Sequence, residues 1–372
     1  MKILGIESSC DETAAAVVQD GRTLLSSVVN SQIDIHAVYG GVVPEVAARS
    51  HIEVINPVIN QALSDAKLTW DDIDAVAVSY APGLIGSLLV GTLAARTLAI
   101  LKNKPLYPIH HVESHVYANF LTETANGIWN MEYGDSGSTL IANSQIPIAT
   151  SAPAFPILAL IVSGGHSQLV LFRDHGDYEL LGQTQDDAVG EAFDKVAKIL
   201  GLAYPGGPSI ARAALNGNPT KYKLPKSKLS GKYNFSFSGL KTAVLRAVQH
   251  ETGVDFTFPS SGLAQRLNDV QRADFAASFQ RTAIETLVDK TERAFYDFDA
   301  KSVVIAGGVA ANAELRRILS ERIPIHIDYA PSDLCTDNAA MVASMGYYYS
   351  LKNQPISPYE LEVIPSLSMS AK

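Results

Sequence analysis

The sequence has only two cysteines, Cys10 and Cys335, among its 372 residues. A disulfide-stapled scaffold and a cysteine-built zinc finger both need more cysteines, so these two classes are excluded. Charged residues make up 18% of the chain and hydrophobic residues 47%, whereas disordered chains combine high charge with low hydrophobicity. The sequence therefore predicts a folded chain, and its length suits about two domains.

The sequence also has no continuous apolar run of about 20 residues, the length that crosses a membrane. Its two charge-free stretches, 75–95 and 136–172, are interrupted by Gly, Ser and Pro. The first ten residues do not follow the plan of a signal peptide, because Glu7 comes soon after a short apolar run. We therefore expect a cytoplasmic protein that makes no contact with a membrane.

Acidic residues are absent from 195–250, although the whole chain has a net charge of −9. This basic segment holds ten Lys and Arg residues, with Tyr and Phe placed between them in its densest part. Cations and aromatic rings together suit phosphate contacts and base stacking, as in nucleic-acid binding. The alternative is a solvated surface loop.

Predicted strands alternate with predicted helices along the chain, which indicates an α/β fold. The expected strands are 2–7, 14–19, 75–79, 157–162, 168–172 and 303–305. The expected helices are 51–63, 84–101 and 336–351, and 263–298 is expected to hold one long helix or two shorter ones. The helix at 84–101 is expected to be buried. Residues 121–155 show no hydrophobic periodicity and are expected to form a polar loop. Two strand–turn–strand units, at 3–18 and 158–172, share one plan and suggest two similar lobes.

Two histidines, His111 and His115, are spaced four residues apart. If this segment is helical, both imidazoles lie on one face and can bind one divalent ion. The metalloprotease motif is excluded, because it needs Glu directly after the first His and Val112 stands there. A third ligand must come from elsewhere, and Asp337 is the candidate. The alternative for this region is that Thr336 or Asp337 caps the helix that follows.

Glycine-rich turns are expected after two of the predicted strands, at 163–166 and 307–308, and again at 204–208. Backbone N–H groups in such turns bind anions, and a helix N-terminus adds to this attraction. Neither the Rossmann fingerprint nor the P-loop pattern is present. Glu12 and Asp194 lie beside such turns and could bind a ligand hydroxyl or act as a base. Ordinary turn glycines and surface carboxylates are the alternatives.

Taken in order, the motifs of this sequence closely resemble those of the bacterial TsaD family, the tRNA threonylcarbamoyladenosine transferases. The resemblance covers about residues 1 to 350. The motifs are GIESSCDET at 5–13, GVVPE at 41–45, HVESH at 111–115, VSGGH at 162–166, FDK at 193–195, YPGGP at 204–208, FSFSGLKT at 235–242, GGV at 307–309 and CTDN at 335–338.

The resemblance implies an actin-like (ASKHA, ribonuclease H-like) α/β fold of two lobes with an active-site cleft between them. We expect the lobes at 1–108 and 109–350, followed by an extended or mobile tail at 351–372. The implied reaction transfers a threonylcarbamoyl group from threonylcarbamoyl-adenylate to the exocyclic amine of the adenosine 3′ of the anticodon. The expected substrates are tRNAs that read codons beginning with adenine, and AMP is released.

The resemblance also implies roles for individual residues. His111, His115 and Asp337 would hold one metal ion, with Fe²⁺ favoured over Zn²⁺, and Glu12 would be the active-site acid. The residues expected to hold the adenylate donor are Ile161, Val162, Ser163, Gly164, Gly165, Asp194, Gly207 and Asn312. Those expected to face tRNA are Lys221, Lys223, Lys226, Lys228, Lys232 and Lys241. Expected partners are a TsaB-like paralogue and a TsaE-like ATPase.

Two other functions stay open on the sequence. One is a metal-dependent endopeptidase, against which Val112 argues. The other is a non-catalytic ATP-binding scaffold of the same fold, which would need no metal ligands. One departure from the family pattern is the polar insertion at 121–155, which separates His115 from Ser163.

Overall fold

The computed structural model describes residues 1–124, 131–133, 139–141 and 152–370. The chain forms two compact units. The first unit comprises Met1–Pro153, His175–Asp177 and Asp328–Lys372, and the second comprises Ala154–Asp174 and Tyr178–Ile327. These bounds differ from the expected lobes at 1–108 and 109–350, because the helices α4 (His111–Tyr117) and α11 (Ala339–Ser350), which were expected in the second lobe, pack into the first unit.

The first unit is built on a sheet whose strands follow the order β5-β4-β1-β2-β3-β8-β7, with β6 also paired to β3. Strand β1 is antiparallel to β2 and parallel to β4. The strands are β1 (Lys2–Glu7), β2 (Glu12–Gln19), β3 (Thr23–Ser31), β4 (Ala75–Ala81), β5 (Leu106–His110), β6 (Glu123–Thr124), β7 (Met131–Tyr133) and β8 (Thr139–Ile141).

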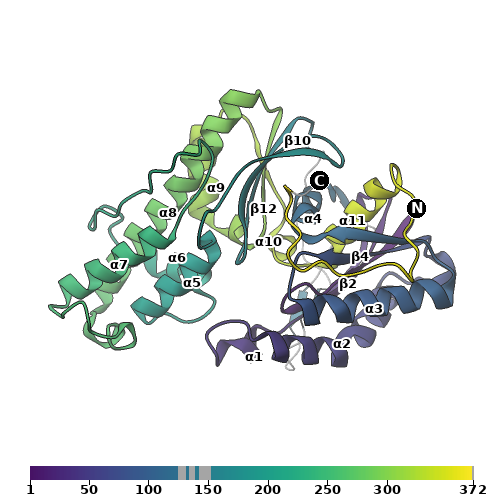
Figure 1. Ribbon diagram of the computed structural model, residues 1–372, viewed down its shortest axis with the longest axis horizontal. Helices are drawn as coiled ribbons and strands as arrows, with labels where there is room; N and C mark the ends of the chain where they lie inside the picture. Colours follow the sequence, from purple (N-terminus) through teal and green to yellow (C-terminus); the bar gives the residue numbers. More distant parts are fainter. Residues whose placement is uncertain (125–130, 134–138, 142–151, 371–372) are drawn as a thin grey trace. The chain divides into compact units, whose positions relative to one another are not determined.

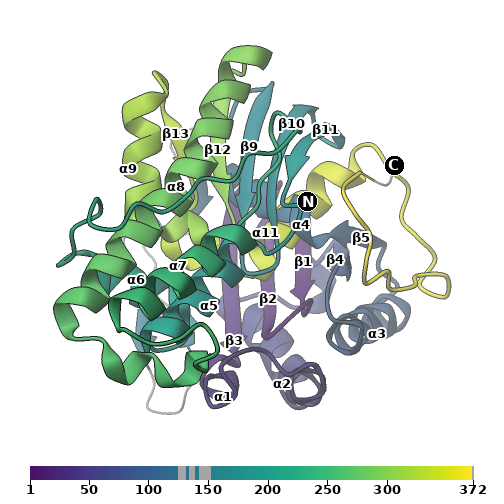
Figure 2. The same ribbon diagram turned by 60° about the vertical axis from the view of Figure 1, so that its left-hand side comes forward.

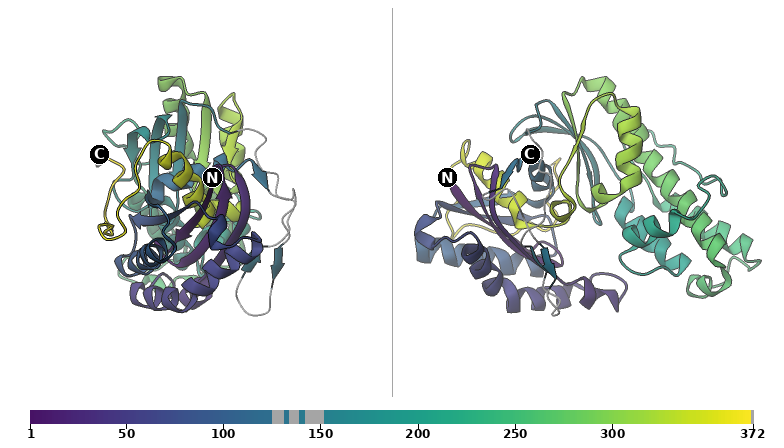
Figure 3. Two further views of the ribbon diagram at one scale, coloured as in Figure 1. Left: turned by 90° about the vertical axis from the view of Figure 1, so that its right-hand side faces the viewer. Right: turned by 180° about the vertical axis from the view of Figure 1, so that it is seen from behind.

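Helices cover both faces of this sheet. Successive side chains of β1 point to opposite faces, so β1 contacts helices on both sides. Leu4 and Ile6 pack with Ile55 and Ile59 of α2 in one core cluster. A Cβ on Gly5 would lie 2.3 Å from the Ala339 carbonyl oxygen, so α11 approaches the opposite face closely. Helices α2 and α3 lie side by side (Figures 1 and 3). The helices are α1 (Ile33–Ala37), α2 (Pro44–Asp65), α3 (Ile85–Lys102), α4 (His111–Tyr117), α10 (Ser332–Cys335) and α11 (Ala339–Ser350).

Helix α3 is only partly buried, so the expectation of a buried helix at 84–101 is wrong for one of its faces. Ile85, Leu89 and Leu93 are 60%, 42% and 52% exposed. By length and composition alone, α3 is the one helix in the described part of the chain that could cross a membrane. It packs against α2 and β4 through its other face.

The second unit has a sheet of order β11-β10-β9-β12-β13. Helices α8 and α9 run beside each other next to it (Figure 2). The strands are β9 (Ile157–Val162), β10 (Ser167–Asp174), β11 (Asp177–Gln183), β12 (Ser302–Ala306) and β13 (Ile327–Tyr329). The helices are α5 (Val189–Leu200), α6 (Gly206–Ala214), α7 (Ser238–Glu251), α8 (Asp269–Phe298) and α9 (Ala313–Arg322).

The two sheets share one strand order. Reading from β3 gives β3-β2-β1-β4-β5, and reading from β11 gives β11-β10-β9-β12-β13. In each, the first hairpin is antiparallel and the strand on its other side is parallel. The internal repeat expected from the two strand–turn–strand units is therefore confirmed.

Two segments that were expected to lie outside the regular structure contact the first unit: the polar insertion at 121–155 and the tail at 351–372. Within 121–155, the strands β6, β7 and β8 join the first sheet, while 125–130, 134–138 and 142–151 lie outside the described residues. The tail after Ser350 is extended and bonded to the first unit. Ile356 pairs with Leu106, and the Gly83 N–H donates to the Pro365 carbonyl at 3.1 Å.

Candidate metal centre and active site

Helix α4 brings His111 and His115 together with Asp337 in the first unit. Asp337 Oδ1 lies 3.6 Å from His111 Nε2 and 3.3 Å from His115 Nε2. The three candidate ligand atoms all lie within 4.8 Å of one another, and both histidines are buried. The three residues predicted as metal ligands therefore lie together, in a geometry that could hold one ion.

Asp337 is available to the histidines because its neighbour caps the next helix. The Asn338 side chain accepts from the Met341 N–H at 3.0 Å and donates to the Thr336 carbonyl at 2.8 Å. Asn338 is thus the N-cap of α11, and the alternative expectation that Thr336 or Asp337 caps it is wrong. The Asn338 amide caps α11, while the Asp337 carboxylate beside it faces the imidazoles of His111 and His115.

The cluster fits a divalent metal ion. Within the described residues neither ring nitrogen of His115 has a hydrogen-bond partner, although this ring is buried. Buried polar atoms are normally satisfied, so a ring left this way beside a carboxylate points to a ligand that completes it. Two imidazoles and one carboxylate leave coordination positions open, as in catalytic Zn²⁺ sites and non-haem Fe²⁺ sites.

Glu7 lies behind His111, at the end of β1. Its Oε2 is 3.0 Å from His111 Nδ1. Burial opposes the charged imidazolium, but the Glu7 and Asp337 carboxylates outweigh it and raise the pKa of His111 to about 9. Burial likewise opposes the Glu7 charge, yet His111 lowers the pKa of Glu7.

Metal affinity is expected to depend steeply on pH, because the ion must displace a proton from His111. With a His111 pKa of about 9, Zn²⁺ affinity should fall about tenfold for each pH unit below that value. Competition with a chromophoric chelator across neutral to alkaline pH measures this slope. Calorimetry in buffers of different ionisation enthalpy should show about one proton released per ion. An affinity that does not change with pH contradicts the His111 assignment.

Glu12 begins β2 and lies within electrostatic reach of the cluster. Its Oε1 accepts from the Ser31 hydroxyl at 3.2 Å. Burial, together with the neighbouring carboxylates of Asp11 and Asp337, raises the pKa of Glu12 well above its usual value. A carboxylate tuned in this way takes up a proton more readily than an ordinary surface carboxylate.

Helices α2 and α3 hold the turn before Glu12 in place. His51 Nε2 lies 3.0 Å from the Cys10 carbonyl, and Ser87 Oγ donates to the same oxygen at 3.0 Å. His51 Nδ1 lies 2.7 Å from the Thr13 hydroxyl. Neither His51 nor Glu7 was among the site residues predicted from the sequence. The one signal for Glu7 was a carboxylate ending an otherwise apolar strand.

In the second unit, the turn after β9 meets the turn after β12. Gly307 has φ of +88°, and a Cβ there would lie 2.5 Å from the Val162 carbonyl oxygen, so only glycine fits. At Gly164 and Gly165 a Cβ would meet no atom within 4 Å, so the space on the Cβ side of this turn is open. The side chains of Ile161 and Val162 are fully buried, which leaves only their backbone for a ligand.

The other expected donor-binding residues hold local structure together. Asp194 Oδ1 accepts from the Gly206 N–H at 2.6 Å, which fixes the start of α6 next to Gly207. Asn312 caps α9 by accepting from the Leu315 N–H at 3.1 Å. Their roles toward a donor stay predictions.

The six lysines that were expected to face tRNA fall into two groups. Lys226 pairs with Glu285 and Asp289, Lys232 pairs with Asp297, and Lys241 pairs with Asp187. Lys221, Lys223 and Lys228 are exposed and form no ion pair with any residue that the structure describes. The sequence could not show this division, because the acidic partners come from α8 and from the segment before α5.

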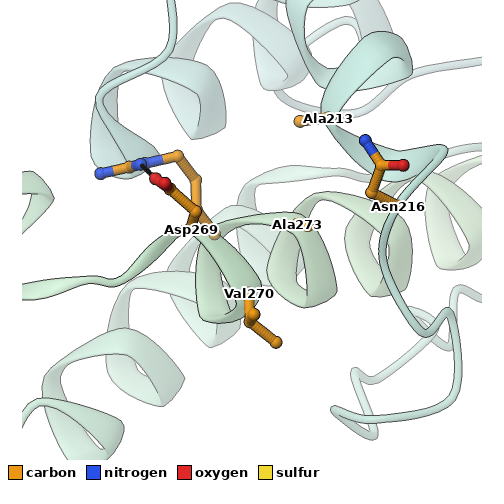
Figure 4. Close-up of a pocket in the computed structure, with 6 residues that line it drawn as sticks. Ala213, Asn216, Asp269, Val270 and Ala273 are labelled. Atoms are coloured by element: carbon orange, nitrogen blue, oxygen red, sulfur yellow. Dashed lines mark hydrogen bonds and ion pairs between the residues drawn. The ribbon is translucent and has the colours of Figure 1, made fainter.

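A separate hollow of about 330 Å³ on the second unit is lined by residues of α6, of α8 and of the turn after α6 (Figure 4). Arg272 is engaged there by Asp269 at 2.6 Å and by the Leu200 carbonyl at 2.8 Å. None of the expected site residues lines this hollow.

The repeated sheets define an actin-like protein, here with a candidate metal site in its first unit. Solved structures agree with the fold. HypF from T. kodakarensis matches with a TM-score of 0.55 at 14% identity, over 94% of this chain and 48% of that one. Full-length HypF in a phosphate- and nucleotide-bound form matches with a TM-score of 0.55 at 12% identity, over 95% of this chain and 56% of that one.

Sequence comparison gives the family. The TsaD family model, described as tRNA N6-adenosine threonylcarbamoyltransferase, matches residues 23–128 and 137–344. A protein of that name from Thermomicrobium roseum is 50% identical, over 94% of this chain and 92% of its own. Another from Dehalococcoides mccartyi is 46% identical over 100% of both chains. The chain belongs to the TsaD family, whose members are transferases that modify tRNA.

Proposed function

We propose that this chain transfers a threonylcarbamoyl group from threonylcarbamoyl-adenylate to the exocyclic amine of the adenosine 3′ of the anticodon. The substrates are tRNAs that read codons beginning with adenine. The observation that carries the proposal is the buried cluster of His111, His115 and Asp337 in a chain of the TsaD family.

The reaction exchanges one acyl bond for another. The bond between the carbamoyl carbon and the AMP phosphate oxygen breaks, and its electron pair leaves with AMP. A bond forms from the carbamoyl carbon to the adenine nitrogen, which gives up a proton. Because this aryl amine is a weak nucleophile, the protein must contribute positioning and proton removal.

Glu12 is the group we propose to accept or direct that proton. Its raised pKa and its place beside the metal cluster support this role. In the second unit, a side chain at Gly164 or Gly165 would meet no atom within 4 Å, and we propose that the backbone N–H groups of this turn bind the donor phosphate.

His111, His115 and Asp337 would hold the ion, and we propose Fe²⁺ because two imidazoles and one carboxylate are typical of non-haem Fe²⁺ sites. Zn²⁺ suits the same donors. When bound, a divalent ion supplies polarisation of the carbonyl or charge neutralisation at the leaving phosphate.

The proposed partners are a TsaB-like paralogue and a TsaE-like ATPase, and the proposed location is the cytoplasm. The test follows labelled threonine from synthetic threonylcarbamoyl-adenylate to a tRNA transcript whose anticodon reads such a codon, with and without these partners. Label on the tRNA and equimolar AMP support the proposal. A transcript with guanosine in place of the target adenosine is the control. No label with active partners favours the scaffold alternative, and cleavage of casein would favour the endopeptidase.

The unpaired lysines should contribute most to tRNA binding. Reversing Lys221, Lys223 and Lys228 to Glu is expected to weaken binding and to lower the slope of log affinity against log salt by about 2 to 3, since each phosphate contact contributes about 0.7 to 0.9. Filter binding at several salt concentrations measures both. Reversal of the exposed Lys67, Lys102 and Lys301 is the charge-matched control. Equal losses in the two triple variants contradict a local tRNA-binding surface.

A further inference from the structure

Glu7 is a fully buried carboxylate surrounded by hydrogen-bond donors. Its Oε1 accepts from the Ser9 N–H at 2.5 Å, and its Oε2 accepts from the Ser79 hydroxyl and faces His111 Nδ1 at 3.0 Å. No Lys or Arg pairs with it in the described ranges of the chain. A buried charge is costly unless it is paired, and His111 is the one cationic partner that the structure gives it.

Two groups contact Nδ1 of His111: Glu7 Oε2 at 3.0 Å and the Ser9 hydroxyl oxygen at 3.1 Å. A carboxylate can only accept, whereas a hydroxyl can also accept, so a proton on Nδ1 satisfies both contacts. In the neutral imidazole the lone pair is then on Nε2, the atom that faces Asp337 and the cluster. His115 differs, because its Nδ1 has no hydrogen-bond partner among the described residues.

We propose that Glu7 is a positioning residue that orients the His111 ring and keeps its proton on Nδ1, so that Nε2 is presented as a metal donor. This inference rests on the proposed metal-dependent function. A carboxylate behind a ligating histidine commonly sets both tautomer and ring orientation, and its loss weakens metal affinity about 10- to 100-fold.

Glutamine cannot replace Glu7 without a mismatch. All three neighbours, Ser9, Ser79 and His111, present donors, and an amide offers only one oxygen. If its NH₂ group faces His111, the proton moves to Nε2 and blocks the metal. If its NH₂ group faces the Ser9 N–H, two donors oppose each other and His111 keeps only a weaker, neutral acceptor.

The test measures the Zn²⁺ dissociation constant of the full chain by chelator competition, well below the unfolding temperature and at one alkaline pH that is the same for all variants. We expect Glu7→Gln to weaken binding about 10- to 100-fold. The ¹⁵N-labelled Zn²⁺ protein should show a slowly exchanging Nδ1–H signal from His111 in the wild type, and Glu7→Gln should lose it. A purely structural role would lower the unfolding temperature without changing either readout.

Glu113→Gln is the matched control. Glu113 is a buried carboxylate on α4, the helix that carries His111, and its charge acts on Tyr80 and Tyr349 instead. Unchanged binding in Glu113→Gln and weaker binding in Glu7→Gln support the proposal. If Glu7→Gln does not fold, Ser79→Ala should give a smaller loss in the same direction, and wild-type affinity in that variant overturns the proposal. Wild-type affinity in Glu7→Gln, or equal losses in both glutamine variants, also overturns it. A wild type that binds no Zn²⁺ overturns it together with the proposed metal site.

Discussion

Replacing His111 by alanine is expected to abolish Zn²⁺ or Fe²⁺ binding and to reduce threonylcarbamoyl transfer by more than about 100-fold. Loss of an outer partner of a metal ligand already costs about 10- to 100-fold, and a direct ligand contributes more. His111 is one of three candidate ligands, so its removal leaves only His115 and Asp337 to hold the ion. Single-turnover transfer from the synthetic adenylate measures the effect, and elemental analysis measures the bound ion.

Two further variants separate loss of the ion from loss of the fold. His326→Ala removes an exposed histidine of the second unit and should behave as the wild type. Asp337→Asn keeps an oxygen donor but removes its charge, so it should bind the ion more weakly than the wild type and more tightly than His111→Ala. Normal transfer by a metal-free His111→Ala protein would show that the cluster is not needed for the reaction.

The strands that open each unit could be predicted accurately because their apolar runs are continuous and end at polar turns. The predicted strands 2–7 and 157–162 coincide with β1 and β9. The start of α2 at Pro44 was missed, because its first turns are largely exposed and carry little hydrophobic period. The exposed face of α3 could not be foreseen either, since a uniformly apolar helix gives no sign of which side is covered.

The candidate site was predictable only where its residues are close in sequence. The i, i+4 spacing placed His111 and His115 on one face, and the structure agrees. Spacing could not show that Asn338 would take the cap and leave Asp337 beside the imidazoles, because both side chains are good caps. The contact of Glu7 with His111 joins β1 to α4, so it depends on the packing of segments about a hundred residues apart.

Glu12→Gln should reduce single-turnover transfer by about 10²- to 10⁴-fold, the range that general acid–base groups contribute. Glutamine keeps the size of the side chain and its contact with Ser31, but it cannot accept a proton. Glu12 is not among the three clustered ligands, so Zn²⁺ binding should stay at the wild-type level. Glu53→Gln, which changes an exposed glutamate of α2, is the matched control.

The pH profile distinguishes a base from a group that only shapes the site. Burial and the Asp11 and Asp337 carboxylates raise the pKa of Glu12, and the base works only when ionised. Wild-type transfer should therefore fall as pH drops through that raised pKa, while the residual activity of Glu12→Gln should not change over the same interval. Near-normal transfer by Glu12→Gln would contradict the role. The amine proton would then have to leave through Asp11 or solvent, and the raised pKa of Glu12 would reflect only its burial and the neighbouring carboxylates of Asp11 and Asp337.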